Sequence, residues 1–457
     1  MNVLPRPSTT HGAPQHAAPA AHAAHGVSAQ RFQAVRAAMV ALAAPLSEAD
    51  CQVQSMPDAS PTKWHLAHVT WFFETFVLER FERDFQPHHP AFRVLFNSYY
   101  QGVGEQHPRT QRGLITRPSL AEVLAYRTAV DERMLALLDV FGRADGDWLA
   151  AQRADFAALV ELGLQHEQQH QELLLTDLLH LLSRNPLLPV YRPQWPLGPV
   201  APVPLKWVEA AGGLVEVGHG GDGFAFDNEG PRHRHWLQPH ALANRLTTHG
   251  EWAQFIADGG YRDPRWWLAA GWDWLRAQQI EAPLYWQREA EGGPWYSFTL
   301  HGRVAIDPHT PITHISLYEA DAYARWAGAQ HGQVWRLPTE MEWEHGAAPH
   351  ALAGIAQGNF VESQALHPLP VRRPGAGLLQ LFGDVWEWTC SSYSPYPGYA
   401  PWPGAVAEYN GKFMVNQTVL RGGSCATPRS HIRASYRNFF PVEARWQFSG
   451  LRLARDL

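Results

Sequence analysis

A proline-rich segment, residues 185–206, divides this chain of 457 residues into two parts of different character. Seven of its 22 residues are proline, a density that excludes helix and favours an extended connection. The chain is also longer than one ordinary domain. We therefore expect two domains, residues 28–184 and residues 207–457, joined by this linker.

The first part carries the apolar periodicity of α-helices throughout. Ser60 before Pro61 is typical of a helix start, with a capping hydroxyl and a proline in the first turn, and Pro118 before Ser119 marks another. Four long helices imply an all-α four-helix bundle. They are expected near residues 28–44, 61–82, 119–142 and 147–183.

The second part is rich in glycine and tryptophan and has few long periodic segments. Helices are expected only near residues 247–257 and 317–328. The remainder has the short apolar runs of strands, separated by long ordered loops. This pattern predicts an α+β domain after the bundle.

Composition excludes several classes of function. A formal net charge of -6 provides no basic surface for nucleic acid, and no apolar run is long enough to span a bilayer. Three cysteines far apart favour a reducing compartment over a disulfide framework. Residues 1–27, low in complexity, are predicted to form a disordered tail. We expect a cytoplasmic protein that acts on small molecules and contacts neither nucleic acid nor membrane.

A histidine pair predicts a metal site in the bundle. His166 and His170 are four residues apart, so they lie on one helical face and can chelate one ion. A histidine from the second helix, either His65 or His68, can complete a three-nitrogen site in the core. Because the chain contains 25 histidines, ordinary polar bundle positions are the alternative interpretation.

Five motifs occur in order along the second part: residues 223–229 (GFAFDNE), 336–344 (RLPTEMEWE), 382–389 (FGDVWEWT), 421–424 (RGGS) and 450–454 (GLRLA). Together they resemble the formylglycine-generating-enzyme (sulfatase-modifying factor, C-type-lectin-like) fold, and the first part resembles a DinB-type bundle with three metal histidines. Formylglycine generators use a close cysteine pair, whereas Cys425 has no near partner, so sulfatase activation is not expected.

The two domains together resemble the ergothioneine-biosynthetic sulfoxide synthases and the closely related selenoneine synthases, over about residues 30–457. The resemblance implies an Fe(2+) enzyme that uses O2 to join a thiol or selenol donor to the imidazole carbon of hercynine, a trimethylated histidine betaine. It also selects His68, within a Leu-Ala-His helix, to join His166 and His170. Three imidazoles leave positions for both substrates and O2, whereas zinc there could not reduce O2.

The resemblance assigns further roles around the metal. Gln169 matches the position that contacts the substrate imidazole. Tyr99 or Tyr100, in the loop at residues 96–105, matches the proton donor to reduced oxygen. A phenol with a pKa of about 10 is protonated at neutral pH, as this role requires. Glu172 is expected either to hold the metal-ligating side chains in place or to face solvent.

Substrate-binding residues are also implied by the resemblance. Arg109 and Arg112 match positions that hold the carboxylate of the sulfur donor, which guanidinium groups bind bidentately. Asn438 matches the residue that binds hercynine's carboxylate, and the aromatic rings of Phe439 and Phe440 can hold its trimethylammonium group. Enzymes that use γ-glutamylcysteine have an acid where this chain has Phe440, so cysteine or a different donor is favoured.

Three alternatives remain at this stage. A selenosugar donor would make the chain a selenoneine synthase, although a selenosugar has no carboxylate for the arginines. A DinB-type thiol transferase would use zinc and no O2. A non-catalytic module would bind ligands only. Metal content, and O2 consumption in the presence of hercynine, separate the last two from the synthase.

Overall fold

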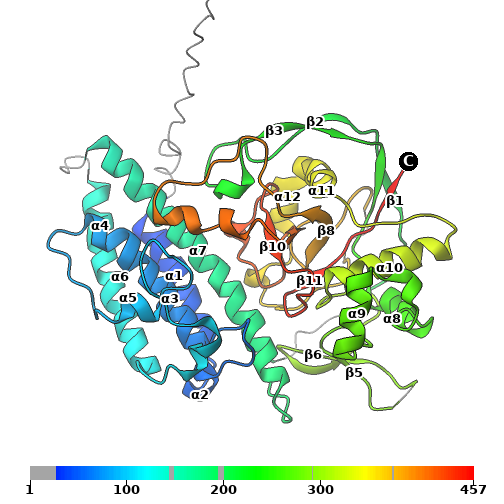
Figure 1. The fold of residues 1–457 in the computed structure, drawn as a ribbon, viewed down its shortest axis with the longest axis horizontal. Helices are drawn as coiled ribbons and strands as arrows, with labels where there is room; N and C mark the ends of the chain where they lie inside the picture. The colour runs from blue at the N-terminus through cyan, green and yellow to red at the C-terminus, as the bar shows by residue number, and fades with distance from the viewer. Residues whose placement is uncertain (1–26, 144–148, 194–199, 291, 373–374) are drawn as a thin grey trace, which may run out of the picture.

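A helical part and a sheet-containing part lie side by side, with the long helix α7 at their boundary (Figure 1). The computed structural model describes residues 27–143, 149–193, 200–290, 292–372 and 375–457. The expected fold class, an all-α bundle followed by an α+β domain, is confirmed. Residues 1–26 of the expected tail, and residues 194–199 of the proline-rich segment, lie outside the described residues.

Four long helices form the first part, as expected from the apolar periodicity. The second of them, α3, continues through a π-helical turn at Glu74–Leu78 into the short helix α4 (Glu79–Phe81). In the described residues, no helix combines the length and apolar character needed to cross a membrane. The helices are α1 (Ala29–Ala43), α2 (Glu48–Gln52), α3 (Thr62–Phe73), α5 (Phe92–Leu95), α6 (Leu120–Gly142) and α7 (Ala150–Ser183).

The two expected helix starts have different outcomes. Ser119 caps α6, and its hydroxyl and the Glu122 carboxylate form a capping box. The expectation that Ser60 caps α3 was wrong, since the N-cap is Pro61 and it makes no side-chain cap. The hydroxyl of Ser60 instead accepts a hydrogen bond from Arg112.

A buried carboxylate holds α7 against two other bundle helices. Glu167 is fully buried, and its two oxygens accept hydrogen bonds from Arg36 on α1, at 2.8 Å, and from Arg127 on α6. A buried charge is tolerated only when it is paired and hydrogen-bonded. This arrangement fixes the rotation of α7, so that His166 and His170 face α3.

The second part contains short strands and five helices within the described residues. Two helices were expected, and both occur, but α9, α11 and α12 were not anticipated. The helices are α8 (His249–Ala257), α9 (Ala269–Gln278), α10 (Leu317–Gln330), α11 (Glu340–Ala347) and α12 (Ala351–Gln357). The strands are β1 (Trp207–Ala210), β2 (Gly213–Val217), β3 (His233–Leu237), β4 (His240–Ala243), β5 (Trp286–Gln287), β6 (Tyr296–Thr299), β7 (Gly302–Ala305), β8 (Trp386–Ser392), β9 (Thr418–Arg421), β10 (Asn438–Phe440), β11 (Ser449–Gly450) and β12 (Ala454–Asp456).

The strands of the described residues form four small sheets, ordered β1-β4-β12, β10-β9-β8-β11, β2-β3 and β5-β6-β7. In the second of these, β9 pairs antiparallel with both β8 and β10, and β11 runs parallel to β8. This sheet gathers three of the sequence motifs, because β8 begins within residues 382–389, and β9 and β11 end at the first residues of 421–424 and 450–454.

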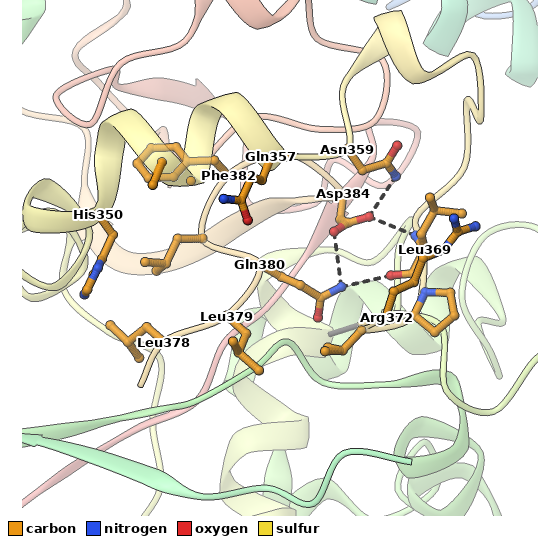
Figure 2. A pocket seen from close by; sticks show the side chains of 16 residues that line it. His350, Gln357, Asn359, Leu369, Arg372, Leu378, Leu379, Gln380, Phe382 and Asp384 are labelled. Carbon is orange, nitrogen blue, oxygen red and sulfur yellow. Dashed lines mark hydrogen bonds between the residues drawn. The ribbon is translucent and has the colours of Figure 1, made fainter. Parts of the chain in front are cut away.

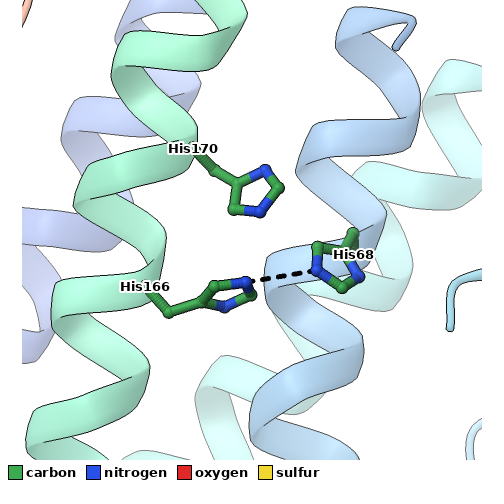
Figure 3. Close-up of side chains that lie close together, drawn as sticks. All are labelled: His68, His166 and His170. Carbon is green, nitrogen blue, oxygen red and sulfur yellow. Dashed lines mark hydrogen bonds between the residues drawn. The ribbon is translucent and has the colours of Figure 1, made fainter. Parts of the chain in front are cut away.

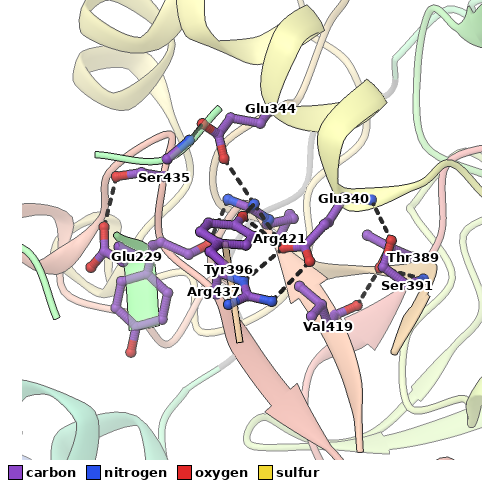
Figure 4. Close-up of polar contacts among 12 residues, drawn as sticks. Glu229, Glu340, Glu344, Thr389, Ser391, Tyr396, Val419, Arg421, Ser435 and Arg437 are labelled. Carbon is purple, nitrogen blue, oxygen red and sulfur yellow. Dashed lines mark hydrogen bonds and ion pairs between the residues drawn. The ribbon is translucent and has the colours of Figure 1, made fainter. Parts of the chain in front are cut away.

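A buried ion network joins the motifs at residues 336–344 and 421–424 to Arg437 (Figure 4). The carboxylate of Glu340 accepts hydrogen bonds from Arg421 at 2.9 Å and from Arg437 at 2.8 and 2.9 Å. Arg421 also donates to the backbone carbonyls of Ala434 and Tyr436. The network therefore fixes the path of residues 434–437, which brings Tyr436 to the boundary with α7.

Candidate active site

Three buried histidines converge between α3 and α7 (Figure 3). His68 comes from α3, and His166 and His170 come from successive turns of α7. Each offers one ring nitrogen, and these nitrogens all lie within 4.8 Å of one another. The Nε2 atoms of His68 and His166 are 3.2 Å apart. The structure thus brings together the three residues expected as metal ligands.

The protonation of these imidazoles suits a metal ion. Burial lowers the pKa of all three, that of His166 to about 3, so they are neutral at neutral pH. His68 Nδ1 lies 2.7 Å from the carbonyl oxygen of Phe96, which can only accept, so its Nε2 carries the lone pair. His166 Nδ1 is buried without a hydrogen-bond partner in the described residues. Three converging neutral nitrogens fit a divalent transition metal.

His65, the competing ligand from the same helix, lies outside this cluster. Its Nδ1 is 2.8 Å from Nδ1 of His170, and its Nε2 is 3.1 Å from Asp177 Oδ2. It therefore contacts a member of the cluster from the side, between α3 and the C-terminal half of α7.

Two tryptophans enclose the His68 ring. Trp64 stacks on it with ring centroids 4.5 Å apart and planes at 11°, and Trp71 stacks at 5.5 Å and 18°. The guanidinium of Arg112 lies 3.5 Å from the centroid of the Trp64 ring. Neither tryptophan was assigned a role from the sequence, although both lie within one helical turn of His68.

The two arginines of the expected donor site differ in position. Arg112 is buried, and burial together with the nearby Arg109 charge lowers its pKa to about 9. Its Nη1 donates to Ser60 Oγ at 2.9 Å. Arg109 is exposed and donates to the backbone carbonyl of Asp58. Of these two arginines, only Arg112 contacts a residue that packs on the histidine cluster, namely Trp64.

Gln169 is held by two tyrosines from the second domain. Its amide nitrogen donates to the Tyr436 hydroxyl at 2.6 Å, and its carbonyl oxygen accepts from the Tyr409 hydroxyl. The Tyr409 ring also approaches His166 edge to face, with centroids 5.7 Å apart. Sequence reasoning missed both tyrosines, because nothing local places residues 240 and 267 positions away beside Gln169.

The hydrogen-bonded chain continues beyond Tyr436. His431 Nε2 lies 2.9 Å from the Tyr436 hydroxyl, and His431 Nδ1 lies 2.6 Å from Gln165 Oε1. Gln165 and Gln169 are one turn apart on α7, so the chain leaves the helix and returns to it. It fixes the face of α7 that borders the second domain.

The expected tyrosine pair lies against the same boundary. The rings of Tyr99 and Tyr100 stack with centroids 4.7 Å apart, and Tyr100 also contacts Trp71. The Tyr100 hydroxyl is buried, and the Tyr99 hydroxyl is its polar neighbour. Burial raises the pKa of both phenols, so both are protonated at neutral pH.

A segment of the second domain contacts the loop at residues 96–105, which carries Tyr99 and Tyr100 (Figure 1, orange). The carboxylate of Glu408 accepts from the backbone nitrogens of Gln101 and Gly102, at 3.0 and 2.7 Å. Lys412 donates to the carbonyl of Tyr99. The loop is therefore positioned by contacts between residues about 310 positions apart.

The three expected hercynine-binding residues on β10 are not equivalent. Phe439 stacks on Tyr393 at 4.1 Å and contacts Phe413, whose ring lies 5.1 Å from that of Tyr99. Asn438 and Phe440 lie on the other face of the strand. In the described residues, no hydrogen bond or ring contact joins either of these two to the histidine cluster.

Comparisons with known proteins agree with this architecture. Residues 31–174 match the DinB superfamily, and residues 204–457 match the sulfatase-modifying factor enzyme 1-like domain. A hercynine oxygenase from Mycolicibacterium thermoresistibile is 32% identical, over 90% of each chain. The chain belongs to the hercynine oxygenase family. The Mycolicibacterium smegmatis hercynine oxygenase is also 32% identical, over 90% of this chain and 94% of its own.

A more distant relative of this chain is named for ergothioneine biosynthesis. The Schizosaccharomyces pombe protein named ergothioneine biosynthesis protein 1 is 25% identical, over 51% of this chain and 28% of its own length. The matched family is one of oxidoreductases, and the chain is accordingly an enzyme of that type.

A separate cleft of about 590 Å³ lies in the second domain of this family member, between α12 and residues 369–372 and 378–384 (Figure 2). The carboxylate of Asp384 at its edge accepts hydrogen bonds from Asn359, Gln380 and the backbone nitrogen of Leu369. These polar groups therefore satisfy one another. None of the histidine cluster lines the cleft, so it is distinct from the candidate active site.

Proposed function

We propose that this chain is an Fe(2+)-dependent, O2-consuming synthase of ergothioneine biosynthesis that joins cysteine to the imidazole carbon of hercynine. The observation that carries the proposal is the buried cluster of three neutral imidazoles, at the boundary of two domains that the named hercynine oxygenases share. A purely structural bundle core has no reason to bury three converging nitrogens, since such groups are costly without a partner.

His68, His166 and His170 would hold the iron. Iron(II) bound there would supply the reduction of O2, which zinc on the same nitrogens could not. Because three protein nitrogens do not fill the positions of such an ion, the thiol and the imidazole can be gathered at one centre. The stacked rings of Trp64 and Trp71 keep His68 in place and exclude water from its faces.

Gln169 would orient hercynine. The two phenols of Tyr409 and Tyr436 fix its amide, and the second amide N–H remains to donate to a substrate imidazole nitrogen. Phe439 and the neighbouring aromatic rings would face the trimethylammonium group, a contact worth about 0.5–2 kcal/mol. Asn438 and Phe440 would require a movement of β10 to reach the same substrate.

Arg112 would bind the carboxylate of the thiol donor. It is buried and makes no ion pair with the described residues, so a carboxylate would neutralise a charge that is costly to bury. Arg109, at the surface, would attract that anion without holding it. A buried guanidinium without an ion-pair partner among the described residues supports an amino-acid donor such as cysteine over a sugar that lacks a carboxylate.

Tyr99 or Tyr100 would donate a proton as oxygen is reduced. Both are protonated at neutral pH, so either can donate a proton without prior activation. Their stacked rings belong to the loop at residues 96–105, whose backbone Glu408 holds. We place this activity in the cytoplasm, a proposal supported by three cysteines that form no disulfide.

Product analysis tests the proposed function. Purified protein with Fe(2+), O2 and hercynine is offered cysteine, γ-glutamylcysteine and a selenosugar in competition, and the products are identified by mass spectrometry. A hercynyl sulfoxide from cysteine is expected. A selenium adduct would assign the chain to selenoneine synthesis instead. If no adduct forms and the protein binds zinc, a DinB-type thiol transferase is favoured. If no adduct forms and no metal is bound, a binding module is favoured.

A further inference from the structure

A line of side chains extends from the histidine cluster toward the C-terminal half of α7. His170 Nδ1 lies 2.8 Å from Nδ1 of His65, and His65 Nε2 lies 3.1 Å from Asp177 Oδ2. All three residues are buried. His170 and Asp177 are two turns apart on α7, and His65 reaches between them from α3.

The carboxylate of Asp177, at the end of this line, decides which ring nitrogens carry the protons. A carboxylate oxygen only accepts, so the proton between His65 and Asp177 belongs to His65 Nε2. A neutral His65 then has its lone pair on Nδ1, and His170 must donate its own Nδ1–H to it. His170 is left with a lone pair on Nε2, the nitrogen that remains for a metal.

Asp177 is itself held in place. The backbone nitrogen of Ser60 donates to Asp177 Oδ2 at 2.8 Å, and the hydroxyl of Ser60 accepts from Arg112 at 2.9 Å. Ser60 precedes the first turn of α3, so the carboxylate is anchored to the helix that carries His65 and His68. Ser60 thereby connects the carboxylate of Asp177 to Arg112 of the proposed donor site.

We propose that His65 and Asp177 are positioning residues that select the Nδ1–H tautomer of His170 and aim its Nε2 at the metal. This role deepens the proposed function and rests on its metal site. His68 is oriented differently, through the carbonyl of Phe96. Partners behind a ligating histidine fix its tautomer and ring orientation, and their loss costs about 10–100-fold in metal affinity.

The test compares two substitutions at one position. His65→Phe removes the acceptor, whereas His65→Gln retains an amide oxygen that can accept the Nδ1–H of His170. His180→Gln is the matched control, because His180 is a buried histidine as His65 is, but it lies on α7 and bonds to Ser55 and Arg184. Fe(2+) affinity is measured anaerobically by competition with a chelator, and apoprotein melting temperature reports folding separately.

We expect His65→Phe to weaken Fe(2+) binding by about 10–100-fold. His65→Gln and His180→Gln should bind close to the wild-type affinity, and the Co(2+) absorption spectrum should change only in His65→Phe. Wild-type affinity in His65→Phe overturns the proposal. Complete loss of metal in both His65 variants also overturns it, because His65 would then be a ligand itself.

These measurements are independent of turnover. If the wild-type protein binds Fe(2+) and the variants follow the expected order, but no hercynine adduct forms, the proposed reaction fails and the positioning role stands. If adduct forms and His65→Phe retains wild-type Fe(2+) affinity, the reaction stands and the positioning role fails.

Discussion

The indole nitrogen of Trp386 on β8 donates a hydrogen bond of 2.8 Å to the carboxylate of Glu172 on α7. The hydroxyls of Ser424 and Thr427 donate to the same carboxylate, which is buried at the boundary between the two domains. Glu172 lies two residues after His170, so the sheet of one domain is attached to the helix that carries two histidines of the cluster. Solvent exposure, one of the two expectations for Glu172, was wrong, and its contact with the second domain was not anticipated.

Glu172→Ala should destabilise the protein, because it leaves the indole nitrogen of Trp386 and at least one of the two hydroxyls buried without an acceptor. The expected loss in the free energy of unfolding is about 1–3 kcal/mol per group left unpaired. Glu172→Gln, which keeps one acceptor oxygen, should lose less. Urea unfolding of the apoproteins measures both, and equal stability of Glu172→Ala and wild type would refute the contact's role.

His166→Ala should abolish tight Fe(2+) binding. Two remaining imidazoles cannot replace the chelating pair one turn apart on α7, which offers two nitrogens to one ion. Metal content after anaerobic reconstitution and desalting is the measurement. His180→Gln should retain one iron per chain under the same treatment. Full iron in His166→Ala would remove the cluster from consideration as the metal site.

Tyr99→Phe or Tyr100→Phe should divert the reaction. Without the donated proton, the thiol is expected to be oxidised to the sulfinate without coupling to hercynine. The ratio of sulfinate to hercynyl sulfoxide, determined by mass spectrometry, should rise in at least one variant. Tyr393→Phe, which changes a phenol that bonds to Asn228 and stacks on Phe439, is the control. An unchanged ratio at both positions would contradict the proton-donor role.

Arg112→Met should raise the KM for cysteine about 10–100-fold, equivalent to about 1.5–3 kcal/mol for a charge-assisted hydrogen bond. The KM for hercynine should change little. Arg109→Met should have a smaller effect that disappears at high salt, since an exposed charge is screened. Steady-state kinetics with each substrate varied in turn decide the question, and the reverse ranking of the two arginines would contradict the proposed donor site.

Asp384 should make stability depend on pH. Burial raises the pKa of its carboxyl from 3.8 to about 6. Between these values the folded state keeps a proton that the unfolded state has lost, so the contribution to stability is fully present below about pH 4 and is lost as pH rises through 6. The left-handed backbone at Asp384, with φ at 59°, suits asparagine.

The Asp384→Asn substitution removes this titration. Relative to the wild type, its free energy of unfolding should therefore rise by roughly 3 kcal/mol between pH 4 and pH 7. Urea unfolding of both proteins at several pH values measures the difference. A difference that stays constant with pH would show that Asp384 does not titrate in this range.

Local patterns in the chain were sufficient for part of the architecture. The apolar period of about 3.6 residues predicted the four bundle helices, and the spacing of His166 and His170 placed them on one face of α7, because both depend only on residues within one or two turns. The motifs of the second part indicated its fold but not α9, α11 or α12, whose short apolar patterns compete with those of strands.

Only the tertiary structure decided which residues surround the histidines. Tyr409 and Tyr436 reach Gln169, and His65 turns toward Asp177 while His68 joins the cluster, through packing between segments that are from 98 to 267 residues apart. Periodicity specifies the face of a helix, but the partner of that face depends on how α3, α7 and the second domain pack. A buried polar group takes whichever partner this packing supplies, since burial without one is costly.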